Sequence, residues 1–166
     1  NRNGNTEVYV HDLFTSNAID YIRRHREEPF FLYLAYTVPH FNIEVPELES
    51  YARETNWSEP QKILASMITR MDRGIGLILE KLTVLGIEEN TLVFFTSDNG
   101  PMPGEAFTDY FNSNGTLRGG KRDVYEGGIR VPCIMKLPGV IRAETEYHEP
   151  VSMLDLLPTF VNIAGG

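Results

Sequence analysis

The chain has 166 residues, the size of one domain, and its 15 Lys and Arg against 23 Asp and Glu give a net charge of −8. We expect no nucleic-acid partner, because phosphate contacts need clustered basic side chains. No apolar run approaches the roughly 20 residues that cross a bilayer, so no membrane span is expected. One cysteine and four histidines, without a CxxC or HExxH pattern, disfavour a transition-metal site and leave a hard cation held by oxygen ligands.

Two helices and a strand are predicted in the first half of the chain. Residues 12–25 carry apolar side chains at helical spacing. Residues 30–36, FFLYLAY, are apolar throughout, which indicates a strand buried on both faces. A long helix is predicted from the capping box at Ser58 to Gly86. Gly74 and Gly76 lie inside it, and we expect close packing against another element to be the reason.

Two short strands and a helix are predicted in the second half. Residues 91–96 and 131–136 are the strands, the second holding Cys133 as a buried, inert thiol. The irregular stretch 101–129 separates them, and loops of this length are usually functional. Residues 151–163 predict the helix. The order of elements predicts an α/β layered fold with a mostly parallel sheet, of which this chain forms one portion.

Polar side chains follow two of the predicted strands, where ligands bind in open α/β sheets. Asp98 and Asn99 follow residues 91–96 and offer the oxygen ligands that Ca²⁺ or Mg²⁺ prefers, although Asp-Asn-Gly is also a common turn sequence. His40 follows residues 30–36. It is either a general acid or a hydrogen-bond donor to an anion, or it is a loop histidine bonded to the backbone.

Basic residues gather in the glycine-rich stretch around Lys121. Together with Arg118, Arg122 and Arg130, Lys121 would form a local anion site in an otherwise acidic protein. The alternative is a solvated basic loop in which Glu126 and Arg130 pair with each other, and for those two residues we favour this interpretation.

Several motifs, in this order and over residues 12–166, resemble the sulfatase family. They are FFLYLAYTVPH ending at His40, MDRGIG from Met71, VFFTSDNG from Val93, LRGGK from Leu117, EGGIRVP from Glu126 and MLDLLPT from Met153. The resemblance implies a three-layer α/β/α alkaline-phosphatase-like sandwich with a mostly parallel sheet, incomplete in this chain. It also implies hydrolysis of sulfate esters with one bound Ca²⁺ and a formylglycine nucleophile.

The resemblance assigns roles to four residues. Asp98 and Asn99 match calcium ligands, Lys121 matches the lysine that binds a sulfate oxygen, and His40 matches the histidine that contacts the ester oxygen and protonates the leaving group. Cys133 is followed by Ile-Met-Lys and is not the formylglycine motif, which is expected upstream. The family's early Asp-Asp calcium pair and its lysine–histidine sulfate-binding pair are also not in the chain.

We therefore expect residues 1–166 to be a partial sulfatase catalytic domain that lacks the N-terminal nucleophile-bearing part and the C-terminal subdomain. The intact protein would hydrolyse sulfated glycans or aryl sulfates, and this chain alone would be inactive. The alternatives are a phosphonate or phosphodiester hydrolase of the same superfamily, and a catalytically dead fragment or interaction module. An exposed sheet edge would favour self-association. The family's habit implies a secreted, periplasmic or lysosomal location.

Overall fold

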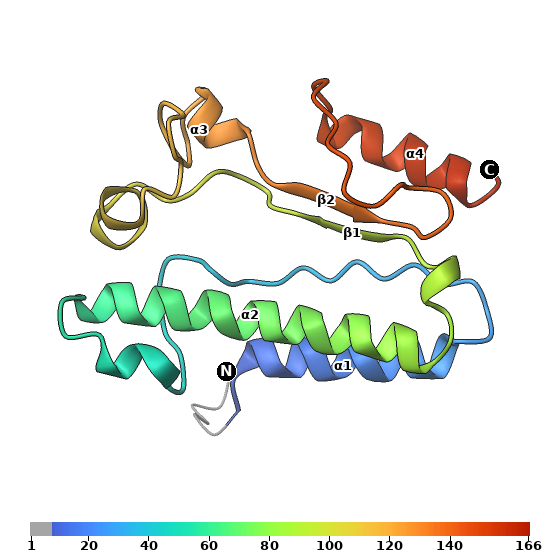
Figure 1. The fold of residues 1–166 in the computed structure, drawn as a ribbon, viewed down its shortest axis with the longest axis horizontal. Coiled ribbons are helices and arrows are strands. Elements are labelled where there is room, and N and C mark those ends of the chain that lie inside the picture. Colours follow the sequence, from blue (N-terminus) through green and yellow to red (C-terminus); the bar gives the residue numbers. More distant parts are fainter. Residues whose placement is uncertain (1–7) are drawn as a thin grey trace.

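The computed structural model describes residues 8–166, which form three layers (Figure 1). Two long helices lie side by side in one outer layer, a two-stranded ribbon and an extended segment form the middle, and a short helix lies on the ribbon's other side. The elements are α1 (Val10–His25), α2 (Glu59–Val84), β1 (Val93–Thr96), α3 (Glu126–Ile129), β2 (Cys133–Lys136) and α4 (Leu156–Ile163). None of the helices in this part of the chain is long and apolar enough to cross a membrane.

The predicted helices α1 and α2 are confirmed, and both bury an apolar stripe. Ile22 of α1 is 2% exposed, and Leu64 of α2 is equally buried. A Cβ at Gly74 would lie 2.8 Å from Oγ1 of Thr15, so this glycine permits close contact between the helices, as predicted. The same prediction is wrong for Gly76, because that position has no neighbouring atom within 4 Å.

The stretch 30–36 is extended but forms no strand ladder with the described residues, so the predicted strand buried on both faces is wrong. Its side chains alternate instead: Phe31 and Tyr33 are 69% and 82% exposed, whereas the residues between them are partly buried against the helices. A strand is covered on both faces only when neighbouring strands and a second layer surround it. Here Phe31 meets that layer, with its ring centroid 5.9 Å from that of Phe160 in α4.

The two strands β1 and β2 pair antiparallel, with Val93 opposite Lys136 and Thr96 opposite Cys133. The sequence predicted mainly parallel strands. Parallel neighbours need a crossover, usually a helix, and the irregular connection 97–132 reverses the chain direction instead. Both faces of β2 are exposed, so the expected burial of Cys133 is wrong as well: its thiol is free and exposed.

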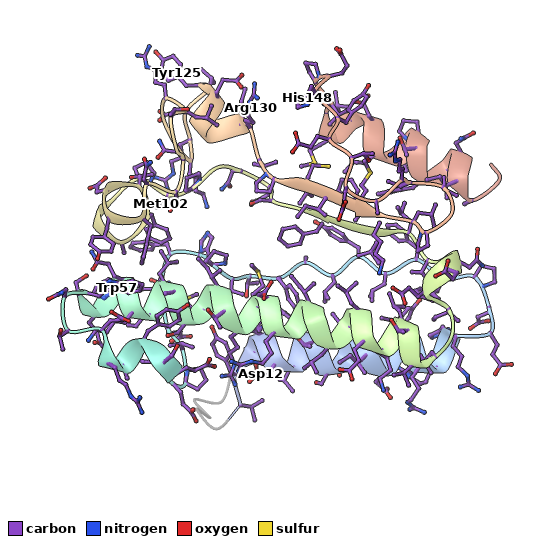
Figure 2. All side chains as sticks on the ribbon, in the orientation of Figure 1. Asp12, Trp57, Met102, Tyr125, Arg130 and His148 are labelled. Carbon is purple, nitrogen blue, oxygen red and sulfur yellow. The ribbon has the colours of Figure 1, made fainter. Side chains whose placement is uncertain are left out.

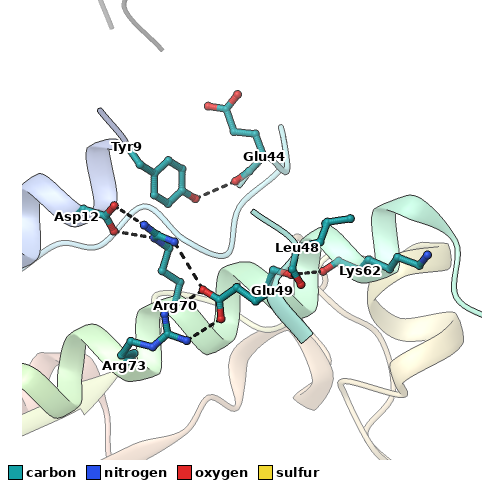
Figure 3. A network of polar contacts seen from close by, with 9 residues as sticks. Tyr9, Asp12, Glu44, Leu48, Glu49, Lys62, Arg70 and Arg73 are labelled. Atoms are coloured by element: carbon teal, nitrogen blue, oxygen red, sulfur yellow. Dashed lines mark hydrogen bonds and ion pairs between the residues drawn. The ribbon is translucent and has the colours of Figure 1, made fainter. Parts of the chain in front are cut away.

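An ion-pair network fixes the segment that precedes α2 against both long helices (Figure 3). Arg70 donates to both carboxylate oxygens of Asp12, at 2.8 and 2.7 Å. Arg73 donates to both oxygens of Glu49, at 3.0 and 2.6 Å, and Arg70 lies 3.6 Å from the same carboxylate. The hydrogen bonds from Arg70 and Arg73 lower the pKa of Asp12 and of Glu49, respectively. The network thereby anchors the stretch of chain that follows His40.

Candidate functional site

His40 and Lys121 lie 81 residues apart in the sequence and meet in space. Nζ of Lys121 is 3.2 Å from Nε2 of His40. Nδ1 of His40 lies 3.1 Å from the carbonyl oxygen of Phe41, and a carbonyl only accepts, so we assign the ring proton to Nδ1. Nε2 then accepts a hydrogen bond from the Lys121 ammonium. The predicted cation, Lys121, and the predicted acid, His40, are therefore neighbours. From there Lys121 can contact an anion while His40 contacts a leaving oxygen.

A tight turn presents Lys121. The amide of Asp123 donates to the carbonyl of Gly120 at 2.9 Å, and the carboxylate of Asp123 accepts from the Gly120 amide at 3.0 Å. Lys121 is the second residue of this four-residue turn, and its amide donates to the carbonyl of Pro101 at 2.8 Å. The turn therefore holds the backbone of Lys121 against the segment that follows β1.

Glycines allow three backbone segments to meet beside this turn. The Gly100 amide donates to the carbonyl of Gly128 at 2.9 Å, and the Gly127 amide donates to the carbonyl of Arg118 at 2.8 Å. A Cβ on Gly127 would lie 2.1 Å from the carbonyl oxygen of Gly119, and one on Gly100 would lie 1.8 Å from that of Gly127. No side chain fits in either place. We call these contacts the glycine junction; it joins the turn after β1 to the loop that carries the lysine.

Asp98 and Asn99 present oxygen atoms at the end of β1. Asp98 is exposed and forms no hydrogen bond or ion pair with another described residue. Asn99 donates from Nδ2 to the carbonyl of Gly100 at 2.9 Å, which leaves Oδ1 without a partner in the described part of the chain. Two such oxygens suit a hard cation, but Ca²⁺ takes six to eight. Among the residues whose side chains the structure describes, no cluster of three or more His, Cys, Asp or Glu could hold a metal.

A large groove connects two of the predicted site residues. It has a volume of about 2140 Å³ and is lined by α2, the extended stretch 30–36 and β1, and both His40 and Asp98 lie on its wall. Small-molecule sites usually measure about 300–1,000 Å³. We therefore interpret the groove as a space between the layers, with the polar side chains of His40 and Asp98 on its wall, rather than as a ligand pocket.

An aromatic cluster that the sequence analysis missed fixes the loop after β1 to the start of α2. Trp57 stacks on Tyr51 with ring centroids 5.6 Å apart and meets Phe111 and Tyr110 edge-on, at 5.1 and 5.9 Å. Figure 2 shows Trp57 at the same end of the molecule as Met102, in the segment that contacts the Lys121 turn. Four aromatic residues in two short irregular stretches were the signal available in the sequence.

The basic residues around Lys121 make different contacts. Arg130 pairs with Glu126, as expected. Arg118 lies over the ring of Tyr125, with Cζ 3.7 Å from the ring centroid. This cation–π contact was not predicted, because it depends on how the loop folds back on itself.

The chain was compared with known protein families and with curated proteins. The family model described as Sulfatase matches residues 1–166. Steryl-sulfatase of Rattus norvegicus is 36% identical over 154 residues, covering 90% of this chain and 26% of that protein. N-acetylgalactosamine-6-sulfatase of Mus musculus is 34% identical over 165 residues, covering 96% and 30%. The chain thus spans under a third of these relatives.

Solved structures agree on the fold. The crystal structure of Ps i-CgsB in complex with k-i-k-neocarrahexaose is 35% identical, with a TM-score of 0.82 over 95% of this chain and 34% of that one. A putative sulfatase, yidJ of Bacteroides fragilis, is 23% identical with a TM-score of 0.66 and supports the fold alone. The expected fold class, an incomplete alkaline-phosphatase-like α/β sandwich, is confirmed by these neighbours. This chain belongs to the sulfatase family.

Proposed function

We propose that the full-length protein carrying this chain hydrolyses sulfate esters, with sulfated glycans as its substrate class. The observation that carries the proposal is the contact between Lys121 and His40, which sets a fixed cation and a proton-carrying ring side by side. Support for the substrate class comes from relatives named for N-acetylgalactosamine 6-sulfate and from a neighbour bound to a neocarrahexaose. The family match favours sulfate over phosphonate or phosphodiester chemistry.

In the proposed reaction a nucleophile attacks the sulfur and forms a new bond to it, while the bond between sulfur and the ester oxygen breaks. The ester oxygen takes up a proton and leaves as an alcohol. The Lys121 ammonium contacts a sulfate oxygen and stabilises the negative charge in the transition state. His40 donates a proton from Nε2 to the leaving oxygen, so this nitrogen must carry a proton when substrate is bound. Contact with the sulfate would draw the Lys121 ammonium away from Nε2, and this nitrogen would take a proton from solvent before it protonates the leaving oxygen.

We propose Asp98 and Asn99 as two of the ligands of a Ca²⁺ ion. Their unpartnered oxygens fit a hard cation, and further carboxylate ligands would come from outside the described residues, which hold no cluster of three or more His, Cys, Asp or Glu. The ion would supply positive charge next to the sulfate. The nucleophile is not assigned within these 166 residues, since Cys133 does not lie in a formylglycine motif.

Substitutions in the full-length protein test these roles. Lys121→Ala should lower kcat by about 10²–10³-fold, the loss seen when one stabilising donor is removed. His40→Ala should lower kcat by about 10²-fold for an alkyl sulfate and far less for a nitrophenyl sulfate, whose leaving group needs no proton. Lys81→Ala, which removes the same charge from α2, is the matched control. Wild-type turnover by Lys121→Ala, or equal losses on both substrates for His40→Ala, would contradict the assignments.

We further propose that the 166-residue chain, by itself, is inactive and self-associates. β2 has one edge unpaired among the described residues, and large apolar side chains nearby are open to water, with Ile134 62%, Leu157 73% and Leu154 86% exposed. Such surfaces promote edge pairing and association. Light scattering across a concentration series tests this, and a monomer at all concentrations, or turnover by the isolated chain, would disprove it.

A further inference from the structure

The turn that carries Lys121 contains a second cation in an unfavourable conformation. Arg122 is the third residue of the turn and has φ +82°. Turns with a positive φ at this position normally use glycine or asparagine there, because a Cβ costs free energy in that region. Glycine is common on both sides of the turn, yet position 122, where glycine would relieve the strain, holds arginine. Backbone strain of this kind is retained at functional sites, so the conformation of Arg122 indicates a functional role for its side chain.

The charges around Arg122 leave it free to bind an anion. Neither Arg122 nor Arg118 forms an ion pair with any carboxylate whose side chain the structure describes. Two carboxylates close to Arg122 in the sequence are already engaged, Asp123 by the Gly120 amide and Glu126 by Arg130. Two exposed arginines without an ion pair to the described carboxylates therefore lie in or next to this turn in the sequence, in a protein of net charge −8.

Arg118 is held in place while its donors stay accessible. Its guanidinium lies over the ring of Tyr125, which is 43% exposed, and Arg118 itself is exposed. A guanidinium held over a ring by its flat face keeps the N–H groups at its edge available, and such a group fits the paired oxygens of a sulfate or carboxylate. Figure 2 shows Tyr125 and Arg130 beside α3, on the side of the molecule away from the two long helices.

We propose that Arg122, assisted by Arg118, binds a second anionic group of the glycan next to the sulfate ester contacted by Lys121. The site would favour glycans with an additional sulfate or a carboxylate over those with a single sulfate. The inference rests on the proposed function, because it places the scissile sulfate at Lys121. Arg122 is a specificity-determining residue in this assignment and takes no part in bond breaking.

The test uses the full-length protein and three variants. Arg122→Gly removes the side chain and the backbone strain, Arg122→Lys keeps the charge without the fork, and Arg24→Ala removes one charge from the far end of α1 as a control. The substrates are oligosaccharides with one sulfate, two sulfates, or one sulfate and one carboxylate. Retention on immobilised dextran sulfate, as the salt concentration that elutes each variant, gives a readout that does not require turnover.

We expect Arg122→Gly to unfold at the same temperature as the wild type or higher, and to lose about tenfold in kcat/KM on the doubly anionic substrates alone. It should elute from dextran sulfate at lower salt, Arg122→Lys should be intermediate, and Arg24→Ala should match the wild type. The preferred second group, sulfate or carboxylate, is the one whose substrate shows the larger loss.

Equal losses on singly and doubly anionic substrates, or no change in elution, would overturn the inference while leaving the sulfatase proposal intact. The reverse result is also distinguishable. A wild-type protein that hydrolyses none of the sulfates, yet whose Arg122→Gly variant elutes earlier, would refute the proposed function and support the anion contact.

Discussion

Replacing Gly127 with alanine should break the glycine junction. The same substitution at a glycine on an open helix face should not destabilise the protein, so the two can be compared. A Cβ at this position would lie 2.1 Å from the carbonyl oxygen of Gly119 and 2.6 Å from that of Arg118. Both neighbours are backbone atoms, so no rotamer change can relieve the overlap. To reach even 3.0 Å, the Gly119 carbonyl must move by 3.0 − 2.1 = 0.9 Å.

A movement of this size would disrupt the hydrogen bond from Gly127 to Arg118 and the one from Gly100 to Gly128. At about 1 kcal/mol for each bond, with strain added, we expect the free energy of unfolding to fall by about 2–4 kcal/mol. Because the same backbone carries Lys121, we also expect kcat to fall by about tenfold or more.

Urea denaturation and steady-state kinetics of the full-length protein measure these effects. Gly76→Ala is the matched control: its Cβ would meet no atom within 4 Å, and alanine should raise the free energy of unfolding by about 1 kcal/mol through its better helix propensity. If Gly127→Ala unfolds within about 0.5 kcal/mol of the wild type and keeps its kcat, the close approach does not hold the site together, and the reasoning is refuted.

Three further substitutions test the helical layer in the same urea assay. Arg70→Ala should cost about 1–3 kcal/mol, since it removes the bidentate partner of Asp12 and one partner of Glu49; a cost below about 0.5 kcal/mol would show that the network contributes nothing. Leu64→Ala should cost about 2–5 kcal/mol, because this side chain is 2% exposed and leaves a cavity. His11 is 2% exposed, and desolvation by burial lowers its pKa below 6.5, so the unfolded chain binds more protons and stability should decline as pH falls from 7 to 5. His11→Gln should remove that part of the slope, and an unchanged slope would place the titrating group elsewhere.

The helices could be predicted from the sequence because their signals are local. An apolar stripe and a capping box specify α2, and the side chain of Gln61 indeed accepts a hydrogen bond from the Ser58 amide at 2.8 Å. Gly76 shows the limit of such reasoning, since a glycine in a helix does not reveal whether anything packs against it.

The sheet was predicted less well because strand pairing is not local. Apolar runs located the extended stretch 30–36 and both strands, but the direction of β2 depends on the path of the connecting chain. Cys133 shows the same difficulty: an apolar strand context predicted burial, whereas coverage depends on neighbours that sequence periodicity does not reveal.

The candidate site residues came from ordered motifs rather than from periodicity. The pairing of His40 with Lys121 agrees with their predicted shared role, although the role itself remains a prediction. The conformation of Arg122 was beyond the sequence analysis, since the tetrapeptide Gly-Lys-Arg-Asp does not specify which residue takes a positive φ.

The separation of His40 and Lys121 also has a consequence for the order of folding. Joining the ends of an 81-residue loop costs about 4 kcal/mol of chain entropy, from (3/2)RT ln n, before the contact returns any free energy. The helices need no such closure, and the pairing of Thr96 with Cys133 shortens the remaining loop. The Lys121 turn should therefore dock on His40 late. A newly made full-length protein would gain its helical circular-dichroism signal before it gains catalytic competence, and the delay between the two would report the closing of the loop.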